Sequence, residues 1–363
     1  MAGELNKKIV LEDGSEYFGE GFGFDCERVC EIVFNTSMAG YQEVFYDPAN
    51  ASQMVLMTYP VIGSIGITEE EQDSRTPLIG AVAVRQLDES VGMCASSLDS
   101  MLKENCIPAI SGLDTRALAR KLRGKGRCFA IITNADTDTA CAVEKIKAHK
   151  SEGASAGDVS CKTKRYLRTS MRKFNVVVID CGLRFSYVRL LNKFGCNVTI
   201  VPWDTGAQEI MDIKPDGVVV SSGPGDPRDA MVVAETLNAL KGKVPVFAMG
   251  LGCQLLALSY GAEIEELSTG HRGTNHAVRN LLTGLTETFS QNHGFTLNLD
   301  SLKKTDLVLT HVNVVDGSAE GILCEKDKAF GVLYYPENLL ESTRQDDMLM
   351  RFITTMKEAK KNA

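Results

Sequence analysis

Residues 174–203 read FNVVVIDCGLRFSYVRLLNKFGCNVTIVPW, and this stretch decides the architecture of the second half of the chain. The run NVVVID is largely apolar, which is typical of a strand buried on both faces of a parallel sheet. A helical segment, RFSYVRLLNKFG, follows it, and NVTIVPW reads as the next strand. A strand, a helix and a second strand in this order predict parallel pairing, because the helix supplies the crossover.

The same alternation continues toward the C-terminus. A helix is expected near AQEIMDI, a strand at GVVV (217–220), a helix across DAMVVAETLNALKG, a strand at VPVFAM (244–249) and a helix at LGCQLLALSYG. The pattern predicts an α/β domain over residues 174–363, with an open, mostly parallel sheet flanked by helices.

The first 150 residues have a different pattern. Short apolar runs are separated by turn signals, and KIVLEDGSEYFGEGFGF reads as a hairpin with Asp13 and Gly14 in its turn. Helices are expected near ASSLDSMLKENC and RALARKLRGKG, so this part is predicted to be an α+β domain. Residues 151–173 are polar and then basic without a regular stripe, and they are expected to link the two domains.

Composition restricts the possible functions. The chain has 363 residues, 44% hydrophobic and 24% charged, with a net charge of −8, so a folded protein with a sizeable core is expected rather than a disordered one. The acidic balance argues against binding to nucleic acid. No apolar block resembles a membrane helix or a signal peptide, so a cytoplasmic protein without a membrane partner is expected.

The eleven cysteines are scattered and odd in number, which favours reduced thiols. Cys26 and Cys30 lack a second pair of ligands at zinc spacing, and no metal site is expected.

Ligand sites in open parallel sheets form at the carboxyl ends of strands. Two segments of this chain have that position. The first is SSGPGDP (221–227), whose glycines allow close approach of backbone N–H groups to a ligand, although the spacing alone favours a plain turn at the strand exit. The second is VPVFAMGLGCQ (244–254), where a strand enters a helix through a tight turn, as in a nucleophile elbow. Gly250 is the turn residue, and it has no side chain.

These segments carry a resemblance that covers nearly the whole chain. The sequence resembles the small chain of carbamoyl-phosphate synthetase, whose carboxyl half is a class I glutamine amidotransferase. The amino-terminal half matches in LEDGSEYFG, EIVFNTSMAGYQEV, MTYPVIGSIG and GLDTRALARKLRGKG, and the carboxyl-terminal half matches in SSGPGDP, VPVFAMGLGCQLLALSYGA, GHRGTNHAV, SQNHGF, DGSAEGI and YYPE.

The resemblance implies a function and a partner. In that family the small chain hydrolyses glutamine, and the ammonia passes to a large ATP-dependent chain that makes carbamoyl phosphate, for pyrimidine or arginine synthesis. The chain is therefore expected to be cytoplasmic and to form a heteromer with such a large chain. ATP and magnesium are expected on the large chain, and no cofactor is expected in this one.

The family's catalytic residues carry over incompletely. Its cysteine nucleophile falls on Gly250 and its histidine base on Tyr335, whereas the third triad member is retained as Glu337. A serine that contacts substrate in the family becomes Ala49, and a lysine and an asparagine of the pattern become Arg184 and Ser186. Other positions of the implied glutamine pocket match the family pattern: Gly223, Gly225, Leu251, Gln254, Asn292, Gly294 and Phe295.

The resemblance therefore predicts a pseudoenzyme subunit that keeps the pocket scaffold and lacks its reactive groups. Such a subunit would bind glutamine or a similar small ligand without hydrolysing it. Two alternatives stay open. One is an active amidotransferase with a rearranged triad that uses Cys253, and the other is a binding module that partners a different ATP-dependent ligase.

Overall fold

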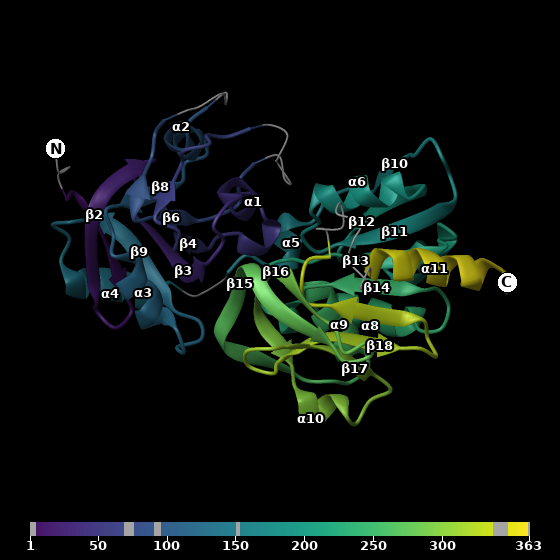
Figure 1. The fold of residues 1–363 in the computed structure, drawn as a ribbon. Coiled ribbons are helices and arrows are strands. Elements are labelled where there is room, and N and C mark those ends of the chain that lie inside the picture. The colour runs from purple at the N-terminus through teal and green to yellow at the C-terminus, as the bar shows by residue number, and fades with distance from the viewer. Residues whose placement is uncertain (1–4, 69–75, 91–95, 150–152, 337–347, 362–363) are drawn as a thin grey trace. The chain divides into compact units, whose positions relative to one another are not determined.

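The computed structural model describes residues 5–68, 76–90, 96–149, 153–336 and 348–361. By their contacts these residues divide into two units (Figure 1). Unit 1 comprises residues 1–153 with 268–273, and unit 2 comprises residues 154–267 and 274–363. Within the described residues, no helix combines the length and the apolar character that crossing a membrane requires.

Unit 1 is built on a closed barrel of seven strands. The hairpin expected around Asp13 and Gly14 is present, because β1 and β2 pair antiparallel on either side of that turn. Around the barrel the strands are β1 (Lys7–Leu11), β2 (Glu16–Gly23), β8 (Pro108–Ser111), β6 (Ala81–Ala83), β4 (Met54–Met57), β3 (Arg28–Asn35) and β9 (Phe129–Asn134). β5 (Val61–Ile62) and β7 (Gln86–Leu87) form a separate parallel pair.

Alternation along these strands sorts the apolar side chains of unit 1 into separate clusters. Ile9 and Leu11 join a cluster with α3 (Thr115–Leu122), whereas Val10 between them packs with α4 (Thr139–Ala148). This follows from the period of two in a strand, which places successive side chains on opposite faces. A third cluster includes side chains of α1 (Tyr41–Phe45) and α2 (Leu98–Glu104). Unit 1 also contains the 3-10 turn η1 (Pro48–Asn50).

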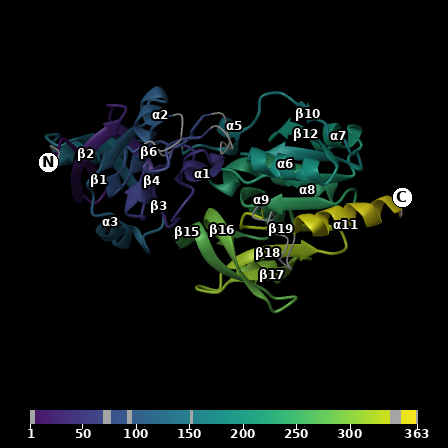
Figure 2. The same cartoon turned by 45° about the horizontal axis from the view of Figure 1, so that its top comes forward.

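Unit 2 contains a ten-stranded sheet with a parallel centre (Figures 1 and 2). The central strands pair in parallel in the order β12, β11, β13, β14 and β19, as the alternation of strands and helices predicts. Antiparallel strands extend the sheet on both sides. In sheet order the strands are β10 (Arg165–Leu167), β12 (Cys196–Pro202), β11 (Phe174–Asp180), β13 (Gly217–Val220), β14 (Val246–Met249), β19 (Ala329–Val332), β18 (Ala319–Cys324), β17 (Val308–Asn313), β15 (Ile264–Asn280) and β16 (Thr286–Leu297).

Helices cover both faces of this sheet. Val176 and Val178 of β11 point into the cluster that includes α6 (Phe185–Lys193) and α11 (Met348–Lys361). Val177 and Ile179 point the other way, toward α7 (Ala207–Asp212), α8 (Met231–Leu240) and α9 (Leu251–Ser259). Two apolar faces explain why the sequence of β11 is a continuous apolar run. The remaining short helices of unit 2 are η2 (Pro227–Ala230) and α10 (Leu299–Leu302).

The segment 151–173, expected as a linker, contributes to unit 2. It contains the short helix α5 (Ala156–Val159) and the edge strand β10. A capping box formed by Ser155 and Asp158 starts α5. Three consecutive residues of β10 pair antiparallel with β12. A strand of three residues, two of them exposed, has too short a pattern to be recognised in sequence.

Candidate functional site

The turn between β14 and α9 has the geometry of an elbow. Gly250 has φ 51° and ψ −119°, a left-handed backbone conformation that strains a residue with a side chain. Its N–H donates to the Val332 carbonyl at 2.9 Å, and its own carbonyl accepts from the N–H groups of Cys253 and Gln254. The elbow is therefore intact in its backbone, although the residue at its corner carries no nucleophile.

Space at the elbow is restricted as well. A Cβ atom placed on Gly250 would lie 2.9 Å from the Cβ of Ser222, closer than side-chain carbons approach one another in proteins. Ser222 follows β13 and is buried. A side chain at position 250 thus requires Ser222 to move.

Cys253 lies inside the core. Its side chain is completely buried. Its Sγ packs so closely against Gly331 of β19 that a Cβ added to this glycine would lie only 2.9 Å from the sulfur. Burial, with a further contribution from the charge of Glu320, raises the pKa of the Cys253 thiol well above its ordinary value. The environment therefore favours the neutral thiol, although the first turn of a helix tends to favour a thiolate.

Tyr335 follows β19, and its backbone and its ring both contact other elements of unit 2. Its N–H donates to the Ser290 carbonyl of β16 at 2.9 Å. Its ring lies 4.7 Å from the guanidinium carbon of Arg184, the N-cap residue of α6. Both side chains are buried, which makes the cation–π contact stronger than it would be in water.

The glycines of SSGPGDP are explained by close backbone packing. A Cβ on Gly223 would lie 1.9 Å from the Cys181 carbonyl oxygen, and one on Gly225, whose φ is 91°, would lie 2.9 Å from the Ala154 carbonyl oxygen. Neither position tolerates a side chain. The structural explanation of these glycines is thus sufficient, and their part in binding a ligand stays a prediction.

Three of the other expected pocket residues join α9 to its neighbours. Leu251 packs against Gly223, and the Gln254 amide donates from Nε2 to the Phe295 carbonyl at 2.9 Å. Asn292 and Gly294 lie on the same strand as Phe295, β16, and are partly buried. The second-half positions of the predicted pocket thus lie on β16, in the first turn of α9 and in the loop after β13.

Two expected site residues are not placed with this group. Ala49 belongs to unit 1, where it is buried in η1 and its N–H is capped by the Asp47 carboxylate. Glu337 lies outside the described residues. Their roles remain predictions. A hollow of about 690 Å³ on unit 1, lined mainly by β2, β8 and the residues around Arg85, contains none of the expected site residues.

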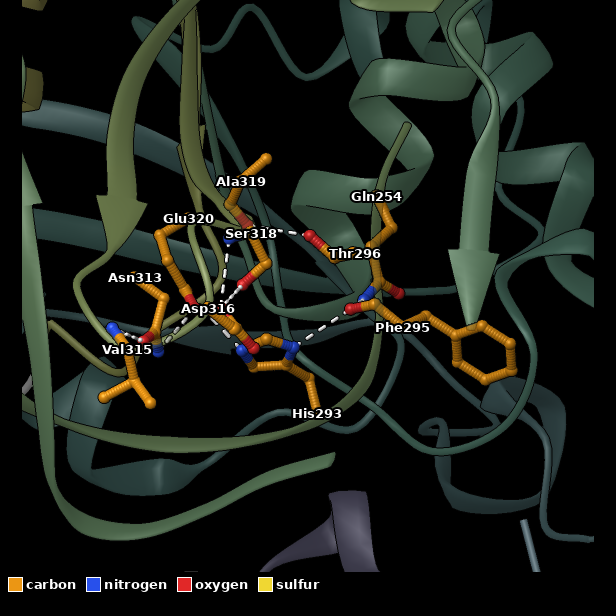
Figure 3. A network of polar contacts seen from close by, with 10 residues as sticks. All are labelled: Gln254, His293, Phe295, Thr296, Asn313, Val315, Asp316, Ser318, Ala319 and Glu320. Carbon is orange, nitrogen blue, oxygen red and sulfur yellow. Dashed lines mark hydrogen bonds and ion pairs between the residues drawn. The ribbon is translucent and has the colours of Figure 1, made fainter. Parts of the chain in front are cut away.

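A buried polar network beside α9 was not anticipated from the sequence (Figure 3). His293 of β16 contacts the Phe295 carbonyl through Nδ1 at 2.9 Å and faces the Glu320 carboxylate of β18 through Nε2 at 3.5 Å. Asn313 of β17 donates to the other Glu320 oxygen at 3.4 Å. Glu320 has no exposed surface, and a carboxyl at such a position needs nearby partners. These residues come from three strands, so no sequence spacing indicates that they meet.

Comparisons with known proteins agree on the two halves of the chain. Residues 9–132 match the family model of the carbamoyl-phosphate synthase small chain, CPSase domain, and residues 177–355 match that of glutamine amidotransferase class-I. A carbamoyl phosphate synthase small chain of Staphylococcus epidermidis is 41% identical over 354 residues, which cover 97% of this chain and 96% of that protein.

Two further relatives give the same agreement over nearly full length. A carbamoyl phosphate synthase small chain of Fusobacterium nucleatum is 40% identical over 92% of this chain and 93% of its own. A carbamoyl phosphate synthase pyrimidine-specific small chain of Halalkalibacterium halodurans is 39% identical over 99% of both chains.

Proposed function

The chain belongs to the family of carbamoyl phosphate synthase small chains, with a class I glutamine amidotransferase domain in its carboxyl half, and from this premise we propose that it has lost its own glutaminase activity. Family membership implies a large-chain partner. The proposed role is that of a structural and regulatory subunit in a complex that uses free ammonia.

Gly250 carries this proposal. It occupies the corner of the elbow, where the family's thiolate would attack the glutamine amide, and glycine supplies no nucleophile. The position cannot regain one simply, because the Cβ of Ser222 lies 2.9 Å from where the first carbon of a side chain would be.

Tyr335 supports the same conclusion from the base position. A phenol, with an ordinary pKa near 10, is a poor proton acceptor at neutral pH. In this protein the ring also packs on the Arg184 guanidinium, so a cation lies over the ring whose hydroxyl would have to accept a proton. Loss of a single triad member typically costs 10⁴-fold or more in rate, or about 5 kcal/mol of transition-state stabilisation at about 1.36 kcal/mol for each factor of ten.

A rearranged triad built on Cys253 has little support. A substitute nucleophile needs exposure to substrate and a lowered pKa, whereas Cys253 is completely buried and the pKa of its thiol is raised. Glutamine or a similar small ligand remains the expected occupant of the retained pocket.

The proposal is tested with the chain and its cognate large chain purified as a complex. We expect carbamoyl phosphate synthesis with ammonium as the nitrogen source and none above background with glutamine. Synthesis from glutamine at a rate comparable to that from ammonium would refute the loss of glutaminase. Failure of the two chains to associate would refute the role as a subunit.

A further inference from the structure

We propose that His293 and Glu320 form a divalent-cation site in unit 2, best suited to zinc, which fastens β16 to β18. The inference does not depend on whether the glutaminase is active. Three observations support it: the separation of two buried ligand atoms, the partners of those two residues, and a buried polar side chain, Gln291, on the same face of β16 as His293.

The two facing atoms are separated by the distance expected for two ligands of one ion. His293 Nε2 and Glu320 Oε2 are 3.5 Å apart, and both residues are buried. An N–H group that donates a hydrogen bond to a carboxylate normally lies about 2.7–2.9 Å from the accepting oxygen. A hydrogen bond would therefore hold these two atoms closer together than they are. Two atoms that bind the same tetrahedral zinc ion, each about 2.0–2.2 Å from the metal, are separated by about 3.3–3.6 Å. The observed distance matches two ligands of one ion.

The tautomer of His293 agrees with this assignment. A carbonyl oxygen only accepts hydrogen bonds, so the 2.9 Å contact with the Phe295 carbonyl places a proton on Nδ1 (Figure 3). Nε2 is then the ring nitrogen that faces the Glu320 carboxylate, and its lone pair would bind the ion. Metal-binding histidines are usually oriented in this way, with the second ring nitrogen donating to a carbonyl or carboxylate. The carboxylate is oriented as well, because Asn313 donates to its other oxygen.

A third side chain lies on the same face of β16. Gln291 precedes His293 by two residues, so both side chains point to the same side of the strand. It is 2% exposed, and among the described residues neither its amide oxygen nor its amide nitrogen has a hydrogen-bond partner. A buried amide without a partner costs about 1–3 kcal/mol, so its oxygen is available as a further ligand. Water would complete the coordination of the ion.

The chemistry of the donors favours a transition metal over magnesium or calcium. Imidazole nitrogen with a carboxylate oxygen is a common combination for zinc, whereas the harder cations prefer oxygen ligands alone. The ion would neutralise the Glu320 carboxylate in the core. Through the Phe295 carbonyl, which also accepts from Gln254, it would stabilise β16 against the first turn of α9.

The test measures zinc bound to the full-length protein. After loading with zinc and dialysis against metal-free buffer, elemental analysis is expected to find about one zinc per chain. The Glu320→Gln and His293→Gln variants are expected to lose it. Two matched controls, His149→Gln at the exposed C-cap of α4 and Glu325→Gln at the exposed position after β18, are expected to retain it.

A second measurement guards against variants that do not fold. In the wild-type protein, zinc is expected to raise the melting temperature and a chelator to reverse the shift, because an ion that binds only the folded state stabilises it. Gln291→Leu, which keeps the volume and removes the amide, is expected to reduce the shift. Absence of zinc from the loaded wild-type protein would overturn the proposal. Equal zinc content in Glu320→Gln and wild type would overturn it as well, because the metal would then be bound elsewhere, for example by cysteines.

Discussion

The guanidinium carbon of Arg184 lies 4.7 Å from the ring centre of Tyr335, and both residues are buried. The pair joins the start of α6 to the segment after β19, two elements that the sequence separates widely. Family resemblance places a lysine and a histidine at these positions. A planar guanidinium stacks on an aromatic ring better than an ammonium group does, so the two replacements suit each other.

The Arg184–Tyr335 contact is expected to contribute measurably to stability. A double-mutant cycle with Arg184→Met and Tyr335→Leu isolates the pairwise energy from the other contacts of each side chain. We expect a coupling of about 0.5–2 kcal/mol in urea unfolding, because the pair is largely removed from water. Tyr335→Phe serves as the control, since it keeps the ring and should keep most of the coupling. A coupling of zero would show that the two side chains merely lie close to one another.

Side chains at the elbow are expected to destabilise the protein. Gly250→Ala adds a Cβ at a left-handed φ and 2.9 Å from Ser222, for an expected loss of about 2–4 kcal/mol. Gly261→Ala is the matched control. Its φ is +86° and nothing lies within 4 Å of the added carbon, so it measures backbone strain alone, about 1–2 kcal/mol.

The role of Ser222 can be tested in the same background. Adding Ser222→Gly to Gly250→Ala is expected to recover the steric part of the loss, about 1 kcal/mol or more, because the opposing Cβ is removed. Thermal or urea unfolding of the four proteins decides between the two causes. Equal losses for Gly250→Ala and Gly261→Ala would show that Ser222 imposes no restriction.

Cys253 is expected to resist alkylation in the native protein. Its thiol is buried and its pKa is raised, so the reactive thiolate is scarce and inaccessible. Treatment with iodoacetamide at pH 8, followed by peptide mapping, should label the exposed Cys106 and Cys141 first and Cys253 only after unfolding. Rapid labelling of Cys253 would support the rearranged triad instead.

An ion-pair cluster on unit 1 is expected to make stability depend on pH. Hydrogen bonds from Ser15, Lys125 and Lys121, in this order of importance, lower the pKa of the Asp13 carboxyl. A lowered pKa in the folded state gives stability that is present above the unfolded value, near 3.9, and is lost as the pH falls through the lower folded value. Because the carboxylate is about one-third exposed, its contribution at pH 7 is expected to be only about 0.5–1 kcal/mol.

Asp13→Asn removes this charge and keeps an oxygen for Ser15. The variant is expected to be less stable than wild type in urea at pH 7, and the difference should disappear well below pH 4. Asp300→Asn, which breaks the exposed pair with Lys303, is the control and should change stability little at either pH. A loss for Asp13→Asn that persists at low pH would point to packing rather than charge.

Features that depend on a local sequence pattern could be predicted from the sequence. The hairpin at Asp13 and Gly14, the parallel strands β11 to β14 and the glycine elbow all follow from turn residues and apolar periodicity within short segments. Closure of the barrel in unit 1 could not be predicted. It depends on parallel pairing of β3 with β4, β4 with β6 and β6 with β8, and pairing between separate strands leaves no local pattern.

The candidate site divides in the same way. The elbow turn at Gly250 was predicted from the strand–turn–helix pattern, and the roles of the site residues stay predictions from the family resemblance. The partners of the side chains were not found, because Arg184 meets Tyr335 and His293 meets Glu320 only through the order of strands in the sheet. The close approach of Ser222 to position 250 could not be predicted either, because it depends on the distance between two loops.

Ammonia release from glutamine, measured with the purified chain in complex with its large chain, tests the loss of the glutaminase most directly. We expect no release above the buffer blank from the wild-type protein. We also expect Gly250→Cys with Tyr335→His to gain little unless Ser222→Gly and Arg184→Lys relieve the two obstacles. Release by the wild-type protein at an ordinary enzymatic turnover would contradict the loss of the glutaminase.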